Sequence, residues 1–404
     1  MEGQFAQYRY VLVNTLVSLL AFGRNLLFMK TLGLADLGQV ALMQTIVMLV
    51  GFLQLGTING AYVLFAEDKP EQTQRIAVVL NLGLALLLGV FALFALAGGG
   101  QALMPMVEPQ TLIIGIFAGL AALASTWMNN FLIAKRALGQ SNSINIVAIA
   151  VSLGAAGLSL QWGLSAALAS MLLQPLLVAL GALVIAPELR PNRARFDSPT
   201  LRLIWSVGIW QFIAGLSVLM TFQVERWLIS LILGNDQLGR FYLVMMFTSF
   251  FQLVPAALLN INLPKAVQAA SNAKLKNVLR RHLQEIIIYS TLILLAVLTL
   301  APNAVHLLLP QFEDSVSLLA LSFPALMFIV LRDNATLALY ATRKMRPLLV
   351  SSVLLLLSYT ALLGIAALTG RFSLEAVVVL RAIAAAASWL YLFLVSRSIL
   401  AKRE

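Results

Sequence analysis

Long stretches without a charged residue constrain this chain more than any other feature. Residues 39–66, 76–107 and 137–187 contain no Asp, Glu, Lys or Arg over 28, 32 and 51 residues. A helix of ~20 apolar residues is enough to cross the hydrocarbon core of a bilayer. Only 11% of the 404 residues are charged, whereas soluble proteins carry about 25%. The sequence therefore predicts an all-α integral membrane protein and excludes a string of soluble domains.

Charges and turn residues divide the chain into twelve expected membrane-spanning helices. The uncharged run of 51 residues must hold two of them, and the Gln-Trp-Gly sequence at 161–163 is the expected turn between the two. The expected spans are 9–31, 38–66, 76–98, 110–134, 142–160, 164–186, 202–233, 239–263, 283–309, 315–341, 347–368 and 374–397.

Basic residues fix the expected orientation. If the N-terminus is cytoplasmic, the inner segments hold 20 of the 27 Lys and Arg residues, the outer loops hold 3, and four lie within spans. Inner loops of membrane proteins are enriched in Lys and Arg. We therefore expect both termini in the cytoplasm. The same bias accounts for the net charge of +11 without a nucleic-acid partner.

One inner segment, 264–282, is unusually basic and has two interpretations. Leu275, Val278 and Leu279 lie near one helical face with lysines and arginines around them. Such a pattern is typical of a helix that lies in the membrane interface and binds anionic lipids. It is equally typical of an ordinary basic inner loop.

The two halves of the chain resemble each other. Residues 32–38 (LGLADLG) match 233–239 (LGNDQLG) at an offset of 201, and the Asn-Asn pair at 129–130 aligns with Asp-Asn at 333–334 at an offset of 204. A repeat of six spans keeps both halves in the same orientation. The sequence predicts two six-helix lobes, 1–200 and 201–404, around a central cavity.

This pattern resembles the Wzx-type polysaccharide and O-antigen flippases of the MOP superfamily, which also contains the MATE drug exporters and the lipid II flippases. The residues that carry the resemblance are the LG-x-x-x-x-G link after span one and the basic loop after span four. The resemblance implies a polyprenyl-pyrophosphate-linked oligosaccharide as substrate, membrane lipids as partners, and polysaccharide polymerase and glycosyltransferases as candidate protein partners. Lipid II flippases typically have two further helices, for which this chain has no room.

Ionisable residues inside the expected spans are the candidate functional residues, because each costs ~2.5–3.5 kcal/mol at the centre of a lipid-facing helix. Four positive and two negative side chains leave the interior with a net charge of +2. Arginine binds phosphate through a planar fork, which suits a pyrophosphate group. The expected pyrophosphate ligands are Arg24, Asn25, Arg226, Arg332 and Arg381, and the expected coupling or gating residues are Glu225 and Asp333.

Several of these residues have more than one interpretation. Arg24 maps onto Glu225 at the offset of 201, so the two could form a gate across the cavity or a static ion pair. Asp333 could take up a coupling proton, or it could neutralise Arg332 or Arg381. Arg381 could bind the ligand or extend its side chain to the outer interface.

Two other functions compete with the flippase. A MATE-type drug or cation antiporter needs an acid inside the membrane, yet every Asp and Glu between residues 9 and 186 falls in an expected loop. A membrane-bound polysaccharide enzyme needs a large outer loop or a catalytic acidic pair, and the sequence predicts neither. No cofactor is expected, and the coupling ion, proton or sodium, is left open.

The charge bias predicts the topology directly. We expect a reporter that is active only outside the cytoplasm to be inactive when fused after Arg195, Lys276 or Arg403, and active when fused after Asp236 or Glu313. Activity after Lys276 would contradict both the twelve-span topology and the six-span repeat.

Overall fold

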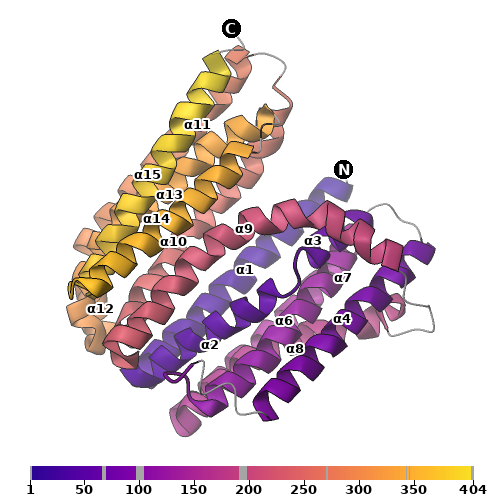
Figure 1. Ribbon diagram of the computed structural model, residues 1–404, viewed down its shortest axis with the longest axis horizontal. Coiled ribbons are helices and arrows are strands. Elements are labelled where there is room, and N and C mark those ends of the chain that lie inside the picture. The colour runs from indigo at the N-terminus through magenta and orange to yellow at the C-terminus, as the bar shows by residue number, and fades with distance from the viewer. Residues whose placement is uncertain are drawn as a thin grey trace. The chain divides into compact units, whose positions relative to one another are not determined.

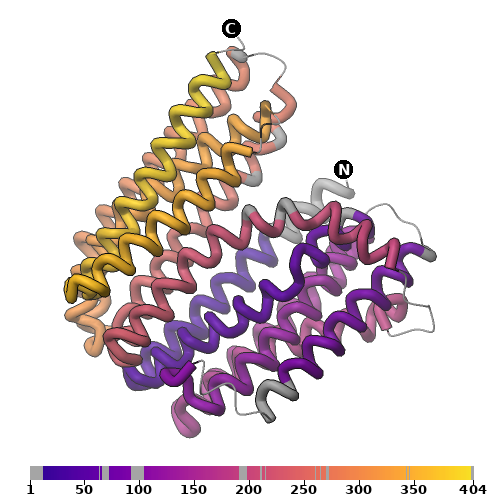
Figure 2. Tube along the Cα trace, viewed as in Figure 1, coloured from indigo at the N-terminus to yellow at the C-terminus, as the bar shows by residue number. Residues whose placement is uncertain are grey.

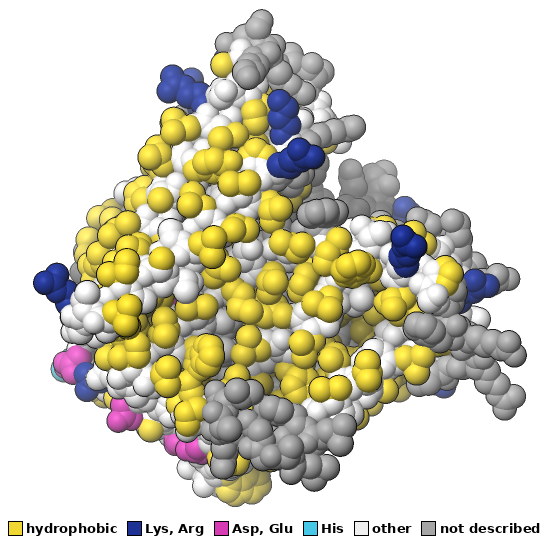
Figure 3. Space-filling view, viewed as in Figure 1, with side chains coloured by type: hydrophobic (Ala, Val, Ile, Leu, Met, Phe, Trp, Pro, Cys, Tyr) yellow, Lys and Arg dark blue, Asp and Glu magenta, His cyan; other side chains and the backbone are white. Residues whose placement is uncertain are grey.

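The computed structural model describes residues 2–65, 70–96, 104–190, 198–269, 272–342, 344 and 346–401. The expected loop residues at 66–69, 97–103 and 191–197 lie outside this part. The described residues form helices and turns, with no β-strand among them, and eleven helical segments are long and apolar enough to cross a membrane. Hydrophobic side chains cover most of the face in Figure 3, over both halves of the chain. The expected all-α membrane fold is confirmed.

The chain divides into two compact units, Met1–Ile213 and Ala214–Glu404, and the division falls within helix α9. The boundary expected after residue 200 lies in the first turn of the same helix (Figure 1). The elements before α9 are α1 (Glu2–Thr31), α2 (Leu34–Phe52), α3 (Thr57–Phe65), α4 (Pro70–Leu96), α6 (Pro109–Ala134), α7 (Leu138–Gly157), α8 (Ser159–Ile185) and the 3₁₀ turn η1 (Pro187–Leu189). The remaining elements are α9 (Ser198–Leu233), α10 (Asn235–Val267), α11 (Asn272–Thr299), α12 (Ala301–Leu308), the 3₁₀ turn η2 (Pro310–Ser315), α13 (Val316–Ala341), α14 (Arg346–Leu368) and α15 (Leu374–Ala401).

Helix α6 is the centre of the N-terminal unit. It packs against α2 on one side and α8 on the other, and α7 packs between α8 and α1 (Figure 2). Small residues allow the close approach, because a Cβ added at Gly119 would lie 2.6 Å from the side chain of Val50. Close packing through small residues is the usual way in which membrane helices associate, since lipid gives them no hydrophobic driving force.

The second expected span, 38–66, is wrong as a single helix. Helix α2 ends at Phe52 and α3 begins at Thr57, with Leu55 and Gly56 at positive φ of 49° and 88° between them. Gln54 satisfies the start of α3, because its backbone carbonyl accepts from the Thr57 amide (2.9 Å) and its side-chain oxygen accepts from the Ile58 amide (3.0 Å). Hydrophobicity alone did not reveal this break, because the residues around it are as apolar as a continuous helix.

The break lets α3 touch α9 backbone to backbone. Gly56 and Gly60 form a Gly-x-x-x-Gly pair, which permits close helix crossing. A Cβ at Gly60 would lie 1.9 Å from the carbonyl oxygen of Ile204, and a Cβ at Gly208 would lie 1.9 Å from the carbonyl oxygen of Gly56. Only glycine fits at these positions.

The fifth expected span corresponds to α7, which has 20 residues but is not among the eleven apolar segments. Its first half is polar, and those side chains bond to α6 and to one another: Ser141 donates to the Asn129 side-chain oxygen (2.6 Å), and Asn145 donates to the Ser141 carbonyl (2.8 Å). The expected turn at 161–163 falls inside α8, where Gly163 adopts a positive φ of 51° and kinks the helix.

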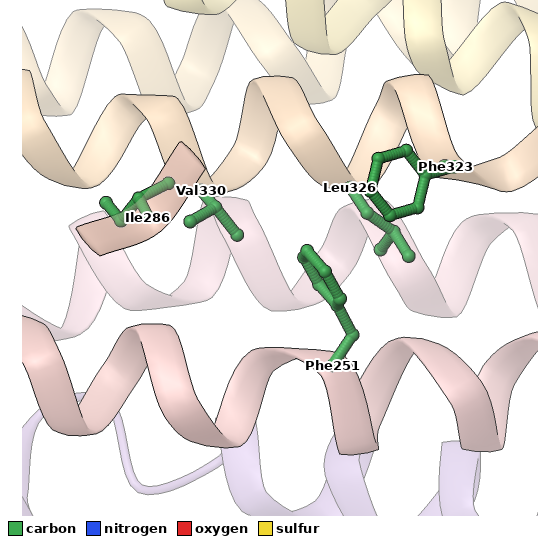
Figure 4. Close-up of a cluster of buried hydrophobic side chains, with 5 residues drawn as sticks. All are labelled: Phe251, Ile286, Phe323, Leu326 and Val330. Atoms are coloured by element: carbon green, nitrogen blue, oxygen red, sulfur yellow. The ribbon is translucent and has the colours of Figure 1, made fainter. Parts of the chain in front are cut away.

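In the C-terminal unit the core gathers around α13. Phe251 of α10, Ile286 of α11 and three residues of α13 form the buried cluster in Figure 4. Phe251 also carries a backbone carbonyl that Pro255, four residues on, cannot bond, because proline has no N–H. The Tyr289 hydroxyl of α11 donates to that carbonyl at 3.0 Å. A side chain thus satisfies the backbone where the proline interrupts the helix.

The ninth expected span, 283–309, is also changed. Helix α11 begins at Asn272 and therefore takes in the basic segment, and the short helix α12 follows it. Leu275 and Leu279 are buried against Leu337 and Ala338 of α13. From Asn272 on, the segment is therefore the start of α11, with its apolar face packed on α13, and not a separate helix or a loop.

The later helices of the two repeat units align at a different offset from the one expected. Helices α6 and α13 both have 26 residues and begin 207 residues apart, at Pro109 and Val316. Gly163 and Gly370, both at positive φ, are separated by the same 207 residues. The Asn-Asn and Asp-Asn echo at an offset of 204 was therefore misaligned by three residues. Three residues are close to one helical turn, so sequence similarity alone did not expose the slip.

The glycine contact between α3 and α9 predicts a stability effect. We expect Gly208→Ala to lower the free energy of unfolding in detergent by about 1–3 kcal/mol, the usual cost of overpacking. The matched control is Gly215→Ala in the same helix, where a Cβ meets no atom within 4 Å. An unchanged unfolding midpoint for Gly208→Ala would contradict the backbone contact.

Candidate functional site

The N-terminal unit contains a buried arginine that donates to side chains of two neighbouring helices. Arg24 of α1 is 8% exposed. Its Nη1 donates to the Ser152 hydroxyl of α7 at 2.7 Å and to the side-chain oxygen of Gln174 of α8 at 2.9 Å. Ser152 in turn donates to the Ser170 carbonyl at 2.7 Å. The arrangement holds three helices, α1, α7 and α8, together.

The C-terminal unit contains a buried ion pair. Arg381 of α15 and Glu225 of α9 are 2% and 1% exposed, and Arg381 Nη1 lies 3.1 Å from Glu225 Oε1. The Tyr359 hydroxyl of α14 donates to Glu225 Oε2 at 2.6 Å. The guanidinium also lies 5.9 Å from the ring centroid of Phe241 of α10. The Nε and Nη2 atoms of Arg381 have no hydrogen-bond partner among the described residues.

These two clusters occupy equivalent positions of the internal repeat. Each joins the first, fifth and sixth helices of its half, at the offset of 201 in the first helix and of 207 in the other two. The polarity is inverted between them. In the N-terminal cluster a cation donates to two neutral acceptors, and in the C-terminal cluster an anion accepts from a neutral hydroxyl and from a cation. The equivalent pairs are Arg24 with Glu225, Ser152 with Tyr359, and Gln174 with Arg381.

The remaining predicted site residues flank these clusters or lie on α13. Asn25 and Arg226 follow Arg24 and Glu225 and are half-buried. On α13, Arg332 is 6% exposed and donates to the Ser352 hydroxyl of α14 at 3.3 Å. Asp333, the next residue, is half-buried. Successive residues point about 100° apart on a helix, so the side chains of Arg332 and Asp333 face different surroundings.

Glu225 and Arg381 pair with each other in the structure. A pair of Glu225 with Arg24 was one expectation, and Arg24 bonds Ser152 and Gln174. Because Glu225 neutralises Arg381, Asp333 is not needed for that purpose. Arg381 is buried in this pair and does not extend to the interface.

Sequence reasoning missed the neutral members of both clusters. Tyr359 and Ser152 were not predicted, and Gln174 was one of several amides in expected spans. A hydroxyl in a membrane helix usually bonds the helix itself or a neighbour, so it carries no signal of its own. The repeat at its true offset of 207 would have pointed to both residues, because it aligns them with each other.

Comparison with known proteins shows which other proteins share this fold. No protein-family model matches the chain, and no curated protein matches it. Several solved structures match the chain. An inward-facing multidrug resistance MATE family transporter of the MOP superfamily aligns with a TM-score of 0.75 at 14% identity, covering 96% of this chain and 95% of that one. The chain has the fold of the MOP superfamily transporters.

Two further structures extend this MOP fold assignment. The lipid II flippase MurJ, in an inward closed conformation, aligns with a TM-score of 0.75 at 15% identity, covering 96% of this chain and 87% of that one. A MOP superfamily transporter from Pyrococcus furiosus aligns with a TM-score of 0.56 at 14% identity, covering 97% and 94%. These neighbours are transporters and a flippase, not enzymes. At such low sequence identities these structures show the fold alone. The substrate has to be inferred from the residues of this chain.

The buried pair predicts a strong and asymmetric effect on stability. We expect Arg381→Met to lower the free energy of unfolding in detergent by about 3–5 kcal/mol, because it leaves the Glu225 carboxylate buried and unpaired. Replacing both residues, as Glu225→Leu with Arg381→Met, should recover most of that loss. Arg397→Met, at an exposed position of the same helix, is the control. Equal stability of Arg381→Met and the control would refute the pairing.

Proposed function

We propose that this chain is a flippase that moves a polyprenyl-pyrophosphate-linked oligosaccharide from the cytoplasmic to the periplasmic leaflet by alternating access. It would work in the bacterial inner membrane, with both termini in the cytoplasm, and supply cell-surface polysaccharide such as O-antigen. The observation that supports it best is the surplus of buried arginine N–H donors in the C-terminal unit, together with the buried Arg24 in the N-terminal unit. The fold also supports it, because a lipid II flippase has the same architecture.

The donor surplus suits a phosphate group. Arg24 bonds neutral side chains, and Nε of Arg332 and two nitrogens of Arg381 have no hydrogen-bond partner among the described residues. Phosphate oxygens accept hydrogen bonds from a guanidinium in pairs, and such charge-assisted bonds are roughly twice as strong as neutral ones. Asn25 and Arg226, half-buried beside the two clusters, are the further proposed ligands.

The apolar part of the substrate needs no enclosed site, because a polyprenyl tail can remain in the bilayer while the pyrophosphate and glycan cross inside the protein. Glycosyltransferases would build such a substrate on the cytoplasmic side, and a polysaccharide polymerase would consume it on the other side. These enzymes are therefore the proposed protein partners.

A MATE-type drug or cation antiporter is the second candidate function, favoured by the fold of the MATE transporters. It requires an acid that can bind a cation. Glu225 already accepts from Arg381 and Tyr359, so it is poorly suited to an organic cation. Asp333 of α13 is a half-buried acid outside this pair. We propose it as the coupling residue for a proton or sodium ion.

The arginine hypothesis is tested by transport. In proteoliposomes with a fluorescent polyprenyl-pyrophosphate disaccharide, we expect Arg24→Ala and Arg226→Ala each to weaken substrate binding about 10- to 100-fold, because a hydrogen bond to a charged group contributes about 1.5–3 kcal/mol. Lysine at either position should restore binding only in part, since it keeps the charge and loses the fork.

Arg371→Ala, at an exposed position, is the matched control and should transport normally. Unfolding midpoints in detergent, measured beside transport, identify a variant that has merely lost stability. Wild-type flipping by the Arg24→Ala, Arg226→Ala double variant would overturn the proposal. Export of a cationic dye without lipid flipping would favour the antiporter.

A further inference from the structure

The N-terminal unit contains an apolar groove that neither polar cluster uses. It has a volume of about 510 Å³, and its walls come from the α2–α3 break, from α4, from α6 and from the start of α9. That volume falls within the ~300–1,000 Å³ of typical ligand sites. Its walls are mainly leucines, including Leu80, Leu87 and Leu123.

Two features of the sequence create the groove. The helix break at Leu55 and Gly56 turns the chain away after α2, and both Leu55 and Gln54 lie at the groove. Gly83 of α4 also lines it, and a Cβ at Gly83 would meet no atom within 4 Å. A larger residue at this position would fill the groove without displacing a helix.

Polar groups lie at the groove as well. Arg202 and Trp205 of α9 line it, and both side chains are exposed. Trp127 of α6 lines it too, is 1% exposed, and its indole Nε1 has no hydrogen-bond partner among the described residues. Among the described residues that line it, the groove thus combines apolar walls with the cation of Arg202 and the unsatisfied buried N–H donor of Trp127.

We infer that this groove binds an anionic phospholipid, with one acyl chain along the leucines and the phosphate at Arg202. The apolar walls match a hydrocarbon chain, and an ester or phosphate oxygen would accept from the Trp127 indole. Tryptophan and arginine together are typical of the headgroup region of a membrane. The charge bias places Arg202 on the cytoplasmic side, where anionic lipids attract basic residues. The inference is independent of the substrate proposed above.

Native mass spectrometry of the purified full-length protein in detergent tests the site, with phosphatidylglycerol and phosphatidylcholine as the probes. We expect one phosphatidylglycerol to bind more tightly than any further lipid. Gly83→Phe should weaken that first binding at least tenfold, because the ring occupies the space of the chain. Gly89→Phe, an equally open and exposed position of α4 that does not line the groove, should leave it unchanged.

The headgroup contact is tested separately. Arg202→Gln should reduce the preference for phosphatidylglycerol over phosphatidylcholine about fivefold, the factor that corresponds to ~1 kcal/mol per basic residue near an anionic surface. Arg397→Gln, also exposed, should not change it. Equal binding of both lipids by the wild type, or full binding by Gly83→Phe, would overturn the inference. Displacement of the phospholipid by polyprenyl phosphate at equimolar concentration would also overturn the inference, because the groove would then be a binding site for an isoprenoid.

Discussion

Charged side chains in a membrane protein must find their partners inside the protein, because hydrocarbon offers none. The Glu225–Arg381 pair meets this constraint in the C-terminal unit, and the Tyr359 hydroxyl supplies a further donor to the carboxylate. The pair ties α9 to α15, and Tyr359 adds α14. Removing one member would leave an uncompensated charge buried among these helices, which is why a single replacement is costly.

The same constraint was met differently in the other half of the repeat. Arg24 occupies the repeat position that is equivalent to Glu225. It donates to the hydroxyl of Ser152 and to the side-chain amide oxygen of Gln174. One architecture therefore carries two polar clusters of opposite character on equivalent helices. The hydroxyl and the amide carry no charge, whereas the partner of Arg381 is a carboxylate.

Backbone N–H and C=O groups, like charged side chains, must find their hydrogen-bond partners inside the protein. Pro255 deprives the Phe251 carbonyl of its helical donor, and Tyr289 from α11 replaces it. At the α2–α3 break, Gln54 caps the new helix with its own side chain. The break in turn allows Gly60 and Gly208 to bring two backbones together, and it opens the apolar groove beside them. Irregular backbone is thus tolerated where protein side chains satisfy it, and it creates shapes that straight helices cannot form.

The sequence by itself determined the membrane class, most of the spans and the list of buried charges, because each depends on composition over a local window. It also indicated a repeat, since the link at 32–38 recurs at 233–239. It did not determine the break at Leu55 and Gly56, the continuation of α11 through the basic segment, or the register of 207, because these depend on which backbone and side chains lie opposite. The partner of Glu225 was likewise decided only by the tertiary structure. Arg24 and Arg381 both lie in expected spans, and only the tertiary structure brings the Arg381 guanidinium of α15 within bonding distance of the Glu225 carboxylate of α9.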